Sequence, residues 1–187
     1  MSLSVLRSAT WLLAVGTALA GTAGAFTLHV DGAPRVTKDQ VYDRDGCGGA
    51  NRSPALAWSA PPAGTRSLAI TMFDPDAPGH GWWHWIVADL PANLRALPAN
   101  AGQTGGGSLP PGAFQGRNDF GGIGYGGPCP PVGDPPHHYV ITVWALRSSR
   151  LPVGRDAGGS AIEAALQRDA IASAHAKLTY GRSRAGR

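Results

Sequence analysis

The residues best suited to chemistry lie close together, in the stretch FDPDAPGHGWWHWIVADL at residues 73–90. Two carboxylates, Asp74 and Asp76, fall in a proline-rich turn, and His84 follows inside a cluster of tryptophans. Acidic groups and an imidazole beside aromatic side chains are what a pocket for a polar ligand requires. The stretch therefore predicts a ligand site, to which the surrounding elements must contribute further groups.

The two carboxylates would repel each other if both were buried and ionised. We therefore expect one of them to accept hydrogen bonds from a histidine or from backbone N–H groups. The alternative is an Asx-type turn in which both acids are solvated.

His84 begins an alternating strand, so its side chain is expected on the same face as Ile86 and Ala88. The plainer interpretation of such a histidine is a core residue whose hydrogen bonds are satisfied. Trp83 and Trp85 are either walls of the pocket or part of the sheet packing, and the pattern leaves this open.

A second pair of histidines, His137 and His138, precedes a predicted strand at residues 139–146. Because neighbours on a strand point to opposite faces, at most one of them can join His84 in a pocket. The histidines and acids lack the local spacing of a metal site, and the chain has no G-x-S-x-G nucleophile motif. We therefore expect neither a metal nor another cofactor, and a hydrolase or metal enzyme is the least favoured function.

A glycine-rich segment, residues 122–127, fits the G-x-G-x-x-G pattern of dinucleotide-binding proteins. That pattern requires a following helix, which the prolines at positions 128, 130 and 131 forbid. Successive glycines can instead present backbone N–H groups to an anion, although a plain flexible loop is the alternative. The preceding Asp-Phe-Gly tripeptide at 119–121 lacks the other kinase motifs, so we do not predict a kinase.

The elements that position these groups are mainly strands. Apolar patterns predict strands at residues 26–30, 67–73, 85–90 and 139–146. Ser160 and Glu163 form an S-x-x-E capping box, which predicts a helix reaching about Ala176. The stretch at residues 92–134 is long, irregular and rich in Gly and Pro. This order favours a mainly β fold, an antiparallel sheet structure with a C-terminal helix.

Composition agrees with one loop-rich domain. The chain has 187 residues, of which 27 are Gly and 16 are Pro, and only 15% are charged, which favours a β or α+β fold. The net charge of +4 is scattered along the chain, so we expect no nucleic-acid partner.

The N-terminus has the pattern of a secretory signal peptide. Arg7 precedes an apolar run at residues 11–20, and a small-residue cleavage site ends at Ala25. Cleavage there predicts a single mature domain, residues 26–187, in the periplasm or outside the cell and without a stable membrane anchor. An uncleaved anchor or a buried first helix is the alternative. Cysteines of exported proteins often pair, but the sequence leaves open whether Cys47 and Cys129 do so.

Five ordered blocks together resemble the phosphatidylethanolamine-binding protein (PEBP) family, and more narrowly its bacterial YbhB/YbcL-type, Raf-kinase-inhibitor-like branch. The blocks are residues 51–58, 73–78 with 81–85, 115–121, 124–131 and 137–139. The resemblance implies a β-sandwich-like core with peripheral helices. It also implies a small anion pocket, which in this family binds phosphate groups, including phospholipid headgroups.

Carried over by position, the resemblance assigns the pocket to residues on four segments: Asp74, Asp76, Pro78, His84, Gly126, Gly127, Pro128, His137, Tyr139 and, from the C-terminal helix, Tyr180. This chain departs from many bacterial relatives at two positions, with His138 in place of Arg and Asp169 in place of His. In the expected site His84, His137 and Tyr139 donate to a phosphate oxygen, and Asp74 orients an imidazole. Binding should then strengthen from pH 7 toward pH 6 as the histidines become protonated.

The sequence thus favours an exported, non-enzymatic protein that binds a small phosphorylated or anionic ligand. The second hypothesis is a regulator of the protease- or kinase-inhibitor type, which would bind a protein partner through its surface.

Overall fold

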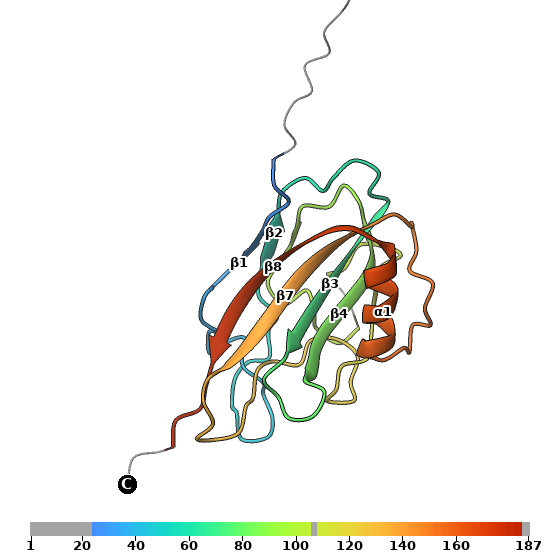
Figure 1. The fold of residues 1–187 in the computed structure, drawn as a ribbon. Helices are drawn as coiled ribbons and strands as arrows, with labels where there is room; N and C mark the ends of the chain where they lie inside the picture. Colours follow the sequence, from blue (N-terminus) through green and yellow to red (C-terminus); the bar gives the residue numbers. More distant parts are fainter. Residues whose placement is uncertain (1–23, 106–107, 185–187) are drawn as a thin grey trace, which may run out of the picture.

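The computed structural model describes residues 24–105 and 108–184, and its elements are mainly strands (Figure 1). In chain order they are β1 (Leu28–Val30), β2 (Leu56–Trp58), β3 (Ser67–Asp74), β4 (Trp82–Pro91), β5 (Ala96–Leu97), β6 (Phe114–Gln115), β7 (His137–Leu146), α1 (Gly159–Asp169) and β8 (Ala170–Tyr180). The predicted signal segment lies outside the described residues except for its last two positions. No helix in the described ranges is long and apolar enough to cross a membrane.

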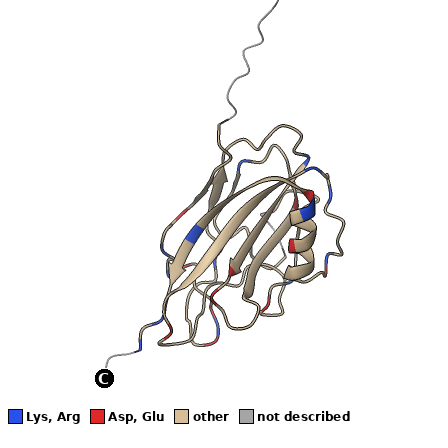
Figure 2. Cartoon of the chain, in the orientation of Figure 1, with Lys and Arg blue, Asp and Glu red and all other residues tan. Residues whose placement is uncertain are grey.

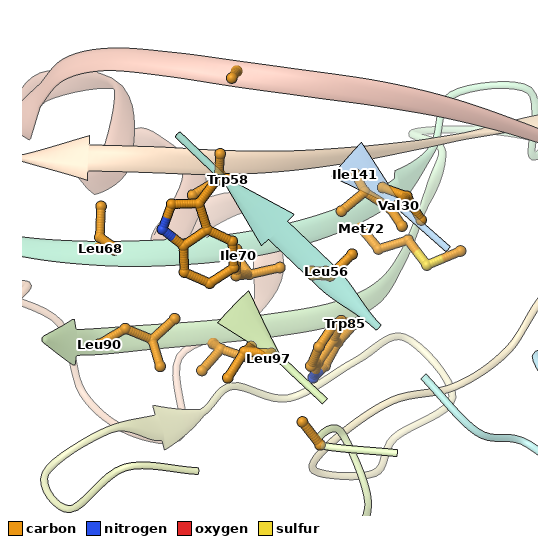
Figure 3. Close-up of a cluster of buried hydrophobic side chains, with 14 of the residues drawn as sticks. Val30, Leu56, Trp58, Leu68, Ile70, Met72, Trp85, Leu90, Leu97 and Ile141 are labelled. Carbon is orange, nitrogen blue, oxygen red and sulfur yellow. The ribbon is translucent and has the colours of Figure 1, made fainter. Parts of the chain in front are cut away.

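The strands form two antiparallel sheets that enclose the main core. The smaller sheet has the order β1-β2-β5, and the larger has the order β6-β4-β3-β7-β8. Figure 3 shows apolar side chains of both sheets meeting between them, among them Leu56 and Trp58 from β2 and Ile70 and Trp85 from the larger sheet. The predicted mainly β fold is therefore confirmed.

The second face of the larger sheet is covered in part by α1, which lies beside β4 in Figure 1. Ile162 and Leu166 of α1 are fully buried in a cluster with Trp83 and Ile86 of β4. Because β3 and β4 are buried on both faces, their sequences are almost continuously apolar. Strand β7 instead alternates, with every second residue from His137 onward buried.

The prediction of a long C-terminal helix is wrong beyond Asp169. Helix α1 ends there, and β8 continues directly to Tyr180, paired with β7 along its length. Alanine-rich sequence has high helix propensity, but hydrogen bonds and packing against β7 override that local preference. The capping box is absent as well, since Gly158 is the N-cap residue and no side chain caps the helix.

Asp169 marks the junction between α1 and β8, far along the sheet from the predicted site. Its carboxylate accepts hydrogen bonds from the backbone N–H and the hydroxyl of Ser148, at 3.1 and 2.9 Å. Asp169 therefore has a structural role at this junction.

Candidate ligand pocket

A cavity of about 290 Å³ lies where the end of β3 meets the starts of β4 and β7. Because these strands are antiparallel neighbours, the three termini fall at the same end of the sheet. The cavity is lined by Asp45, Asp74, Ala77, Pro78, Trp82, His84, Phe120, Cys129, Pro130, Pro131, His137 and Tyr139.

Asp74 and His137 form a buried pair in this cavity. The His137 Nδ1 lies 2.7 Å from Asp74 Oδ2, and both side chains are less than a tenth exposed. Since a carboxylate only accepts, Nδ1 carries the proton, and Nε2 is the nitrogen left for a ligand. Asp74 Oδ1 also accepts from the backbone N–H groups of Asp76 and Ala77, at 2.9 and 3.2 Å. The prediction that one carboxylate accepts from a histidine or from backbone N–H groups is thus confirmed by Asp74, which does both.

His84 reaches the cavity through a β-bulge. Met72 pairs with Trp85 and Phe73 with Trp83, so His84 has no partner on β3. The bulge interrupts the alternation of side chains along β4. Ile86 and Ala88 pack in the cluster beneath α1, whereas the His84 ring lies against Tyr139, with ring centroids 5.1 Å apart. The prediction that His84 shares their face is therefore wrong. A bulge beside a site commonly re-aims a side chain in this way.

The His84 imidazole is neutral at physiological pH. It is buried, and its Nδ1 donates to the Gly126 carbonyl over 2.6 Å, which leaves Nε2 as an acceptor. Burial lowers the pKa of His84 to about 4, although the Gly126 carbonyl and Asp74 act in the opposite direction. The expectation that His84 gains a proton between pH 7 and pH 6 is therefore wrong.

Two buried donors of the cavity lack a partner. Among the described residues, the buried side-chain polar atoms without a hydrogen bond are Trp82 Nε1 and the Tyr139 hydroxyl, and both residues line this cavity. Burial, and secondarily the neighbouring Asp74 carboxylate, raises the pKa of Tyr139, so the phenol keeps its proton. An unpaired buried donor costs about 1–3 kcal/mol. Two in one cavity indicate a site for an acceptor atom.

The aromatic walls come from residues that the sequence did not single out. The Phe120 ring stacks on Tyr42, with ring centroids 4.2 Å apart. It meets the Trp82 and His84 rings edge-on, at centroid separations of 5.4 and 5.5 Å. Trp83 packs against α1 and Trp85 in the main core, so both belong to the sheet packing. Of the tryptophan cluster, Trp82 is the member that lines the cavity.

The predicted anion nest at Gly126 and Gly127 is wrong. The Gly126 N–H donates to the His84 carbonyl at 2.8 Å, and the Gly127 N–H donates to Asn51 Oδ1 at 2.7 Å. Neither group is left for a ligand. These positions require glycine for space, because a side chain at Gly126 would collide with the Phe120 ring and one at Gly127 with the Gln40 carbonyl.

Comparisons with known proteins agree on one family. The family model described as phosphatidylethanolamine-binding protein matches residues 31–181. UPF0098 protein YbcL of Escherichia coli K12 is 48% identical over 147 residues, which cover 78% of this chain and 80% of YbcL. The chain belongs to the phosphatidylethanolamine-binding protein family.

Further PEBP relatives extend this agreement. UPF0098 protein YbhB of the same organism is 45% identical over 135 residues, covering 72% of this chain and 84% of YbhB. A lipoprotein-named relative, LppC of Mycobacterium tuberculosis, is 36% identical over 155 residues, covering 82% and 68% of the two chains. The crystal structure of E. coli YbcL is described as a new member of the mammalian PEBP family. Its superposition on this structure has a TM-score of 0.81 at 44% sequence identity, and covers 83% of this chain and 98% of that chain.

Several residues expected in the PEBP pocket lie outside the cavity. The exposed Asp76 accepts from the backbone N–H and Nδ1 of His138, both at 2.7 Å, and these bonds lower the pKa of Asp76. Pro128 does not line the cavity, and its carbonyl accepts from the Tyr42 N–H. Tyr180 belongs to β8 rather than to a helix, and lines a neighbouring groove. As predicted, only one residue of the 137–138 pair faces the cavity.

The rim of this cavity is held together by contacts between distant parts of the chain. Cys47 and Cys129 form a disulfide, with Cα atoms 5.8 Å apart. Arg182 donates to the Gly46 carbonyl at 2.9 Å and to the Pro130 carbonyl at 3.3 Å. The segment after β8 therefore holds both loops that carry the rim.

Proposed function

We propose that this protein binds a small ligand with a phosphate-type oxygen in the cavity at the end of the larger sheet, and that it acts as an exported binding protein. The observation that carries the proposal is the pair of unpartnered buried donors, Trp82 Nε1 and the Tyr139 hydroxyl, in one cavity. Hydrogen bonds from these donors to ligand oxygens would remove the cost of leaving them unpaired.

The Asp74–His137 pair supports the same ligand. The hydrogen bond from His137 Nδ1 to Asp74 holds the imidazole in place and leaves its Nε2 available to a ligand. The neutral His84 provides an acceptor for a protonated phosphate oxygen or for another donor of the ligand. At about 290 Å³ the cavity has room for a headgroup-sized molecule rather than for a large cofactor.

One feature of the cavity supports binding in place of catalysis, and three features of the chain and its relatives support export. The hydroxyl in the cavity lining belongs to Tyr139, and a raised pKa makes it a poor nucleophile. The disulfide, the signal-like N-terminus and the lipoprotein-named relative favour an oxidising compartment outside the cytosol.

Calorimetric titration with inorganic phosphate and with phosphoethanolamine tests the proposal. We expect saturable binding by the wild type and about ten- to a hundredfold weaker binding by Tyr139→Phe, because one hydrogen bond to a charged ligand is worth about 1.5–3 kcal/mol. Without ligand, Tyr139→Phe should unfold at the same or a higher urea concentration, since it removes an unpartnered buried hydroxyl.

The matched control is Tyr180→Phe, which removes a phenol hydroxyl outside the cavity and should leave phosphate affinity unchanged. A folded wild type that binds neither probe, or equal affinity in Tyr139→Phe, would overturn the proposal. Release of phosphate from phosphoethanolamine by the wild type would instead favour a hydrolase.

A further inference from the structure

A second concave surface lies beside the pocket and is larger. It is a groove of about 980 Å³ whose floor is the end of β8 and the segment after it, at residues 179–184. One wall contains Arg35 and Val36, and the other contains Gly133, Asp134 and Pro136. The groove and the pocket are separate spaces, with His138 facing one and His137 the other.

Backbone hydrogen bonds fix both walls to the floor. The Thr179 N–H donates to the Pro34 carbonyl at 2.8 Å, and the Val36 N–H donates to the Thr179 carbonyl at 3.1 Å. On the other side the Gly133 N–H donates to the Arg182 carbonyl at 2.8 Å. The groove is therefore a preformed feature, and a ligand need not order it.

The charge of the groove is unbalanced. Three arginines, Arg35, Arg182 and Arg184, line it, and within residues 24–105 and 108–184 none of them forms an ion pair with a carboxylate. Figure 2 shows Lys and Arg positions along the chain where it leaves β8. Of the neighbouring acids, Asp76 is hydrogen-bonded to His138, and Asp134 is the one carboxylate among the described residues that line the groove.

We propose that this groove binds an extended acidic segment of a protein partner. Guanidinium groups bind carboxylates through two parallel hydrogen bonds. Arg35 is exposed on one wall, and the exposed Arg184 extends from the floor segment against Gly133 of the other wall. A chain lying between them can pair acidic side chains with both. Tyr180, Val36 and Pro136 add the apolar and aromatic contacts that protein interfaces favour.

The shape and charge of the groove favour a peptide over an anionic membrane. A concave surface with Asp134 in its wall does not present its arginines to a flat bilayer. A single phosphate group is also too small to fill the groove, whose volume is more than three times that of the neighbouring pocket. The inference goes beyond the proposed function, since the groove and the pocket can be tested independently.

Fluorescence anisotropy with fluorescein-labelled octaglutamate tests the inference, with octaglutamine as the neutral probe. We expect octaglutamate to bind the mature wild type and octaglutamine to bind at least about tenfold more weakly. High salt should strongly lower the affinity for octaglutamate. The double variant Arg35→Gln/Arg184→Gln should lose about tenfold in affinity, because it removes two charged partners of the acidic peptide. It should still fold, because neither side chain makes a hydrogen bond or ion pair within residues 24–105 and 108–184.

The matched control is Arg66→Gln/Arg150→Gln, which removes the same charge from two exposed arginines at the other end of the larger sheet. This control should bind octaglutamate within about twofold of the wild type. Tyr139→Phe should also bind it normally, which separates the groove from the pocket. Equal loss in both double variants would show attraction to net charge alone and overturn the inference. No loss in Arg35→Gln/Arg184→Gln, or binding only to phosphatidylglycerol vesicles, would overturn it as well.

Discussion

The two imidazoles of the pocket differ in what they donate to. His137 donates through Nδ1 to the Asp74 carboxylate, whereas His84 donates to the neutral Gly126 carbonyl. Burial is the larger influence on His84 and keeps its pKa at about 4. Any protonation that strengthens anion binding between pH 7 and pH 6 must therefore occur elsewhere in the site.

The buried His84 should make folding stability depend on pH. In the unfolded chain this histidine binds a proton near pH 6.5, but in the folded chain only near pH 4. The unfolded state thus gains protons first, and stability falls as the pH drops from 6.5 toward 4. The loss due to His84 is about 3 kcal/mol. Urea unfolding between pH 7 and pH 4 measures it against His84→Asn, whose amide can still donate to the Gly126 carbonyl.

A control for that measurement is His175→Asn, at an exposed position of β8. It should keep the pH dependence of the wild type, whereas His84→Asn should lose most of it. Identical pH dependence in the wild type and His84→Asn would contradict a strongly lowered pKa of His84.

At the residue scale the sequence identified the polar centre of the cavity but not its walls. Asp74, His84 and one member of the 137–138 histidine pair were predicted from their types and positions beside strands. The family resemblance selected His137 and added Tyr139, and the four residues lie together. Phe120 was overlooked, because its ring reaches the cavity only when its loop packs on Tyr42, a contact between residues far apart in sequence.

Among the elements, α1 and β8 show how tertiary structure limits local prediction. The segment from Ala170 onward has the composition of a helix and becomes an edge strand, because pairing with β7 satisfies its backbone. The strands β3 and β7 were predictable since their apolar patterns are long and clear. The bulge at His84 was not, because it depends on the register between two strands.

The contact between α1 and the larger sheet makes a specific prediction. A side chain at Gly159 would collide with the indole of Trp83, so Gly159→Ala should lower the free energy of unfolding by about 1–3 kcal/mol. In an exposed helix the same substitution would be stabilising by about 1 kcal/mol. Gly158→Ala is the control, because a side chain there meets nothing within 4 Å, and replacing this N-cap glycine should cost less than about 1 kcal/mol. Urea unfolding of both variants decides, and a stabilised Gly159→Ala would show that α1 does not pack this closely.

In the whole molecule, the polar groups of the cavity lie at one end of the larger sheet. The strand ends supply Asp74, His84 and His137, but the rim comes from loops that are distant in the sequence. The disulfide joins positions separated by 82 residues, and Arg182 ties the segment after β8 to both loops. Such long-range closures follow from the complete fold, which is why the sequence left the pairing of Cys47 and Cys129 open.

This closure predicts that stability and binding depend together on the disulfide. The variant Cys47→Ser/Cys129→Ser should unfold with a free energy lower by up to about 4.5 kcal/mol, as expected for a closed loop of 82 residues. Phosphate affinity should fall too, because Asp45 and Pro130 at the rim lose their tether. The wild type in reducing agent should behave as the variant does, whereas reductant should not affect the variant. Lower stability with unchanged phosphate affinity would mean that the ends of β3, β4 and β7 form the binding site without the rim.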